Sequence, residues 1–165
     1  IRILGIDPGS QITGYGFIDV RGDRTILVDW GTIQTSGEHC SRLRQIFEEV
    51  AALVSQHQPA EIAIERVFVH RNADSALKLG QARAAALCAT FEAELPIFEY
   101  AAKHIKKAVV GSGGADKTQV QHMVKMLLAM KVDPQADAAD ALAAALCHSH
   151  ERNTHALFCE AAVQS

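Results

Sequence analysis

Apolar residues in the first third of the chain come in short runs that are typical of β-strands. Residues 1–6 (IRILGI) are nearly all apolar, and the turn-forming sequence DPGS at 7–10 ends the run. Residues 13–20 and 25–33 carry many β-branched and aromatic side chains, and a short turn at 21–23 separates them. We therefore expect three consecutive strands, paired as an antiparallel meander.

Farther along, apolar residues recur at three- and four-residue steps. From Leu43 to Val54 this spacing predicts an amphipathic helix that ends before Pro59. Short strands are expected at 61–65 and 97–100, with an Ala-rich helix within 73–94 between them. Further helices are expected over 103–110, from about 116 to 128, and after Pro134.

The order of these elements predicts an α/β fold. Three strands followed by alternating helices and strands indicate a mixed five-stranded sheet with helices on both faces. Strands reached through crossover helices should lie parallel to the first strand. We expect one domain over 1–150, followed by a polar C-terminal tail over 151–165 that carries surface histidines, as does the sequence His148-Ser149-His150 before it.

The helix within 73–94 is apolar nearly all round between Ala76 and Phe91. A helix on the surface of a small domain normally shows one polar face. Either this helix is buried on two sides within the chain, or one side is a subunit interface.

Composition limits the possible classes of protein. The chain has 165 residues, of which 48% are hydrophobic and 21% charged, which suits one domain with a substantial core. No apolar run approaches the ~18 residues of a membrane span. The four cysteines have no metal-binding spacing, so we expect buried free thiols in a reducing cytoplasm. The net charge of −3 is unusual for a protein that binds nucleic acid.

Four acidic residues occupy positions where a charge is structurally inconvenient. Asp7 and Glu65 each end an apolar strand, and Asp137 and Asp140 lie three residues apart near the start of the last predicted helix. At the carboxyl ends of parallel strands these residues would converge on one edge of the sheet. Clustered carboxylates with few nearby bases suit Mg²⁺, which prefers carboxylate and water oxygens.

Each of these acids also has an ordinary explanation. Asp7 before Pro-Gly is a common turn residue, and Asp137 and Asp140 would complement the dipole of their helix. Taken singly, these explanations are at least as good as a functional one. The convergence of all four positions on one edge favours a joint role.

Several segments closely resemble the RuvC family of bacterial Holliday junction resolvases. They are ILGIDPGS at 3–10, AIERVF at 63–68, NADSALKLGQAR at 72–83, VVG at 109–111, QVQHMV at 119–124 and PQADAADALA at 134–143. The resemblance covers almost the whole chain and implies a ribonuclease H-like fold. It also implies a homodimeric endodeoxyribonuclease that resolves four-way DNA junctions by paired symmetric nicks, with RuvA and RuvB as partners.

The resemblance gives the four acids a role. Asp7, Glu65, Asp137 and Asp140 match the family's catalytic metal ligands. Two Mg²⁺ ions per site are implied, with Mn²⁺ as a possible substitute, and hydrolysis would leave 5′-phosphate and 3′-hydroxyl ends. Two divalent ions would neutralise four of the 19 acidic residues and leave the 16 basic residues in slight excess.

The resemblance also suggests residues that contact DNA. Lys106 and Lys117 match family lysines near the scissile phosphate, and Phe68 matches an aromatic residue that stacks on unpaired bases. Arg71 and Lys107 belong to a run of bases suited to phosphate contacts. The ordinary alternatives are a core phenylalanine and solvated surface charges.

Two other functions remain open. One is a ribonuclease H-like nuclease for RNA–DNA hybrids or transposon ends. The other is a non-catalytic module that binds junctions or, as in actin-like proteins, nucleotides.

Overall fold

The structure is a computed structural model that describes residues 1–66 and 72–163, with side chains up to Arg152. Within these residues the strands form one sheet in the order β3-β2-β1-β4-β5. The strands are β1 (Arg2–Asp7), β2 (Ile12–Arg21), β3 (Arg24–Gln34), β4 (Glu61–Glu65) and β5 (Ile97–Tyr100). The helices are α1 (His39–His57), α2 (Ala73–Cys88), the 3-10 turn η1 (Phe91–Ala93), α3 (Ala102–Val110), α4 (Lys117–Leu127) and α5 (Ala136–Val163).

The pairing of the strands confirms the predicted mixed sheet. β1, β2 and β3 pair antiparallel, while β4 runs parallel to β1 and β5 runs parallel to β4. β4 follows helix α1 and β5 follows helix α2, so each parallel strand is reached through a crossover helix, as the connection rule requires.

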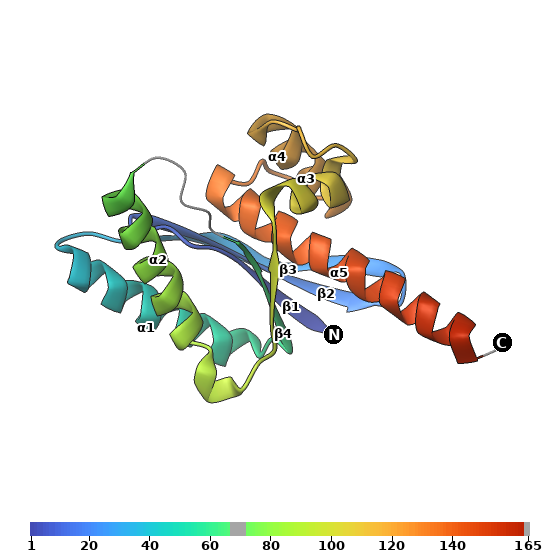
Figure 1. Cartoon of the computed structure of the whole chain (residues 1–165), viewed down its shortest axis with the longest axis horizontal. Coiled ribbons are helices and arrows are strands. Elements are labelled where there is room, and N and C mark those ends of the chain that lie inside the picture. The colour runs from blue at the N-terminus through green and yellow to red at the C-terminus, as the bar shows by residue number, and fades with distance from the viewer. Residues whose placement is uncertain (67–71, 164–165) are drawn as a thin grey trace.

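Helices cover both faces of the sheet (Figure 1). Helices α1 and α2 lie on one face, and α5 crosses the other with α3 and α4 packed against it. Successive side chains of β1 alternate between these layers. Leu4 and Ile6 belong to the cluster under α1 and α2, and Ile3 belongs to the cluster under α5.

Helix α5 is longer than the sequence indicates. It runs from Ala136 for 28 residues, so most of the segment predicted as a polar tail continues the same helix. The proposed domain boundary at residue 150 stays a prediction. No helix in the described part of the chain is both long and apolar enough to span a membrane.

The prediction that His148 lies on the surface is wrong. His148 and Ser149 are both buried, with exposed fractions of 1% and 0%. His148 continues the stripe of α5 that packs on the sheet, seven residues after Ala141. The helical period therefore buries His148 against the sheet, whereas its position near the polar C-terminal segment predicts a surface residue.

The Ala-rich helix α2 is not buried on two sides within the chain. It buries Ala82 and Ala86, while Leu77 is 67% exposed and Phe91, just beyond the helix, is 58% exposed. Cys88 is also exposed. Exposed Cys40 and Cys88 contradict the expectation of buried thiols, which holds for Cys147.

Candidate active site

Two of the predicted acids lie next to each other at the carboxyl ends of β1 and β4. The parallel ladder pairs Gly5 with Ala63 and Ile6 with Ile64, so Asp7 and Glu65 follow at the same level. Neighbouring strands are about 4.8 Å apart, and side chains two residues apart share a face. Asp7 therefore lies on the face of Gly5, which is the face that α5 covers.

The start of α5 brings the other two acids to the same place. A Cβ atom at Gly14 of β2 would overlap the Asp137 carbonyl group and stand 2.9 Å from the Ala138 nitrogen. Gly14 is also the direct partner of Asp7 in the β1–β2 ladder. Backbone contact between β2 and α5 therefore places Asp137 and Asp140 beside the end of β1.

The four carboxylates act on one another electrostatically. Burial, followed by the negative charges of Asp140, Glu65 and Asp137, raises the pKa of Asp7 to about 7, against the opposing effect of Lys117. The ordinary value is 3.8. Such a shift is typical of a carboxylate that shares its site with others of the same charge.

Two lysines partly compensate this negative charge. Burial raises the pKa of both Glu65 and Asp140, and the positive charges of Lys106 and Lys117 lower both. Lys117 makes the closer approach, with its Nζ 3.4 Å from Asp140 Oδ2. Lys106 is half-buried on α3, whereas Lys107 beside it is exposed.

Lys117 projects from a well-defined helix start. Asp116 caps α4 by accepting a hydrogen bond from the Gln119 backbone N–H at 2.8 Å. The Gln119 side chain accepts one in return from the Asp116 backbone N–H at 2.9 Å. This capping box fixes the backbone from which the Lys117 side chain reaches Asp140.

The donor set fits a hard divalent cation. Carboxylate oxygens are the ligands that Mg²⁺ and Mn²⁺ take from proteins, and four of them converge here. Among the described residues, no three His, Cys, Asp or Glu side chains yet stand close enough to hold one ion. Mutual repulsion and the Lys117–Asp140 ion pair both act against closer approach.

Two predicted DNA contacts, Phe68 and Arg71, lie outside the described residues. They follow Glu65 directly and precede α2. Their proposed roles therefore stay predictions.

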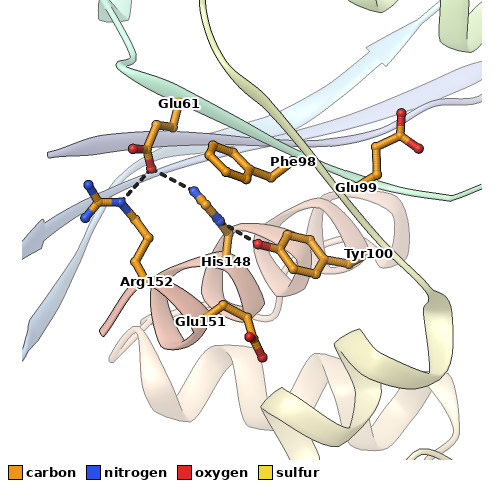
Figure 2. A pocket seen from close by; sticks show the side chains of 7 residues that line it. All are labelled: Glu61, Phe98, Glu99, Tyr100, His148, Glu151 and Arg152. Carbon is orange, nitrogen blue, oxygen red and sulfur yellow. Dashed lines mark hydrogen bonds and ion pairs between the residues drawn. The ribbon is translucent and has the colours of Figure 1, made fainter. Parts of the chain in front are cut away.

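Sequence reasoning missed a buried polar network away from the acids (Figure 2). The Tyr100 hydroxyl contacts His148 Nδ1 at 2.6 Å, and His148 Nε2 contacts Glu61 Oε2 at 2.7 Å. Arg152 donates to the same Glu61 oxygen, and the Phe98 ring stacks on His148. These residues line a cavity of about 590 Å³.

This network connects α5 to β4 and β5. Burial lowers the pKa of His148, which favours the neutral ring, in which Nε2 donates to Glu61 and Nδ1 accepts a hydrogen bond from the Tyr100 hydroxyl. Burial also raises the pKa of Tyr100 to about 12. The polar atoms of this network satisfy one another, which is typical of a structural clamp.

Similar proteins share both the sequence and the fold. The family model for "Crossover junction endodeoxyribonuclease RuvC" matches residues 3–148. A protein of that name from Halorhodospira halophila is 56% identical over 154 residues, covering 92% of each chain. One from Shewanella putrefaciens is 56% identical over 153 residues, covering 92% of this chain and 88% of its own.

Solved structures of Holliday junction resolvases are similar to this chain as well. T. thermophilus RuvC in complex with a Holliday junction substrate superposes with a TM-score of 0.87 at 33% identity, covering 94% of this chain and 96% of its own. The yeast mitochondrial Holliday junction resolvase has a TM-score of 0.60 at 15% identity, covering 96% of this chain and 84% of its own, which shows a shared fold. The chain, with its ribonuclease H-like fold and its acids at the sheet edge, belongs to the RuvC family.

Proposed function

We propose that this chain is an endodeoxyribonuclease that resolves four-way DNA junctions by paired symmetric nicks during recombination and repair. The observation that carries the proposal is the meeting of Asp7 and Glu65 with Asp137 and Asp140 at one edge of the sheet. The T. thermophilus relative that binds a Holliday junction supports the choice of substrate.

Asp7, Glu65, Asp137 and Asp140 would hold two Mg²⁺ ions, which Mn²⁺ can replace. The strands and the start of α5 bring the four acids to one edge of the sheet, and coordination would require closer approach of their carboxylates and displacement of Lys117 from Asp140. Bound divalent ions would supply Lewis-acid stabilisation of the phosphate and a water of lowered pKa.

In the proposed reaction, the oxygen of a water attacks the scissile phosphorus and the bond to the 3′ oxygen breaks. The leaving oxygen takes a proton to become a 3′-hydroxyl, and the phosphate stays on the 5′ end. Lys117 and Lys106 flank the acids, so their ammonium groups can hold the negative phosphate oxygens in place. Orientation by fixed charges is a large part of catalysis in phosphate chemistry.

DNA would cross the face formed by α3 and α4. Lys106, Lys107, Lys117 and Arg71 would contact phosphates, and Phe68 would stack on unpaired bases near the junction centre.

Helix α2 would form the homodimer. Its exposed side presents Leu77, Gly80, Ala84 and Cys88 in one stripe that leads to exposed Phe91. These residues are small or apolar, and a second copy of the same stripe would cover them by two-fold symmetry. Two copies would present two active sites to two DNA strands of like polarity.

We further propose a cytoplasmic location, a nuclease domain over 1–150 and a polar C-terminal tail over 151–165, with RuvA and RuvB as the partners that the resemblance implies. The exposed thiols of Cys40 and Cys88 suit a reducing compartment.

The test is cleavage of a mobile four-way junction, with Mg²⁺ or with chelator, mapped at nucleotide resolution. We expect paired nicks with Mg²⁺ and none with chelator. Asp7→Asn should retain junction binding and lose cleavage by orders of magnitude, because it removes a metal ligand. Asp133→Asn is the matched control, since Asp133 is 81% exposed and paired with Lys125 instead.

The same assay separates the alternatives. Equal cutting of an RNA–DNA hybrid and a junction would favour a different ribonuclease H-like nuclease. Unchanged behaviour of Asp7→Asn would favour a non-catalytic binding module.

A further inference from the structure

Asp140, one of the proposed metal ligands, forms an ion pair with Lys117. Lys117 Nζ lies 3.4 Å from Asp140 Oδ2. Lys117 is 72% exposed at its side chain and Asp140 24%, so the lysine reaches inward from the surface onto a largely covered acid. The capped start of α4 directs it there.

Lys117 interacts with more than its one ion-pair partner. The negative charge of Asp140, followed by those of Asp7 and Asp137, raises the pKa of Lys117. The positive charge of Lys117 in turn lowers the pKa of Glu65. One ammonium group is thus in electrostatic contact with all four acids.

We infer that Lys117 is a built-in counterion that competes with divalent cations for Asp140 and is released toward the DNA phosphate when a cation binds. The inference rests on the proposed function, since it assumes that Asp140 is a metal ligand. A carboxylate oxygen paired with an ammonium group is less available to a cation, and a positive charge beside the site repels one. Once released, the same charge would be available to pair with a phosphate oxygen of the DNA.

The structure also indicates the size of the effect. The ammonium side of this ion pair is 72% exposed, and an ion pair open to solvent on one side contributes little, so a divalent cation can displace Lys117 readily. Competition of this strength predicts that removing the ammonium group tightens cation binding by about threefold to tenfold.

The test measures Mn²⁺ binding by isothermal titration calorimetry, with the full-length chain and no DNA, at fixed pH and low salt. Lys117→Met keeps a long side chain without the charge. Lys125→Met is the matched control, because Lys125 is on the same helix but pairs with Asp133 at 2.8 Å. We expect tighter binding by Lys117→Met, by about threefold to tenfold, and unchanged binding by Lys125→Met.

Equal or weaker Mn²⁺ binding by Lys117→Met would overturn the inference, as would an equal gain in Lys125→Met or no detectable binding by any variant. Junction cleavage is measured separately, and there Lys117→Met should be slower than the unchanged chain despite its tighter cation binding. If the unchanged chain binds Mn²⁺ but cuts no junction, the proposed function fails while the competition remains measurable.

Discussion

Gly14 is the residue whose replacement tests most directly how the site is assembled. It lies on β2 opposite Asp7, and α5 passes over it in backbone contact. In Gly14→Ala the new Cβ atom would overlap the Asp137 carbonyl group and stand 2.9 Å from the Ala138 nitrogen. Both obstacles are backbone groups, so a side-chain rotation cannot relieve the overlap.

The start of α5 must therefore move away from the sheet by on the order of 1 Å, which overpacking of this kind makes costly, at about 1–3 kcal/mol. The movement also takes Asp137 and Asp140 away from Asp7 and Glu65. Misplacement of reacting groups by about 1 Å can lower a rate about 100-fold. We expect Gly14→Ala to lose about that much junction cleavage.

The assay pairs thermal unfolding with single-turnover cleavage of a junction. Gly31→Ala is the control, because its Cβ would meet the Tyr15 ring, which packs with the α1–α2 cluster, at 2.7 Å from the hydroxyl oxygen. Because this obstacle is the far end of a side chain, which can move, Gly31→Ala should cost less stability than Gly14→Ala and spare most of the cleavage rate. If Gly14→Ala and Gly31→Ala lose stability and activity in the same proportion, the close approach at Gly14 has no special role in the site.

Three further predictions follow from burial and charge. Asp7 has a raised pKa of about 7 against 3.8, so the metal-free protein should lose stability as the pH rises from about 4 to 7. At pH 8, Asp7→Asn should therefore raise the free energy of unfolding in urea by on the order of 2 kcal/mol, and lower stability would contradict this. Leu77→Glu on α2 should weaken a dimer about 100-fold in light scattering, while Phe47→Glu on α1 should leave it intact. His148→Ala should cost about 2–4 kcal/mol in thermal unfolding, because it opens a cavity and removes a donor from buried Glu61; a loss below 1 kcal/mol would refute the clamp.

The sequence predicts the sheet well because each strand is marked by a local run of apolar or β-branched residues. The apolar run before Asp7 and the short run before Glu65 each end in an acid, and the rule for parallel strands places both ends at one edge. The three-residue spacing of Asp137 and Asp140 predicts a shared helix face. These inferences need only periodicity and chain direction.

What fixes α5 over the acids is not visible in the sequence. Gly5 and Gly14 resemble any other strand glycines until the ladder shows that both face the helix. Long-range contacts also decide that His148 is inside, because its partners Glu61 and Tyr100 lie 87 and 48 residues away in the chain. Local patterns carry no information about such pairs.

The division of the acids between distant parts of the chain has a consequence for synthesis. Asp7 and Glu65 precede α2, whereas Asp137 and Asp140 arrive only with α5, after every strand has been made. With the four acids in their proposed roles, a nascent chain that has formed only its sheet would carry two of the four metal ligands and would not cut DNA. Nuclease activity in this architecture would therefore begin only after translation has produced α5, so an unfinished copy of the chain would be inactive.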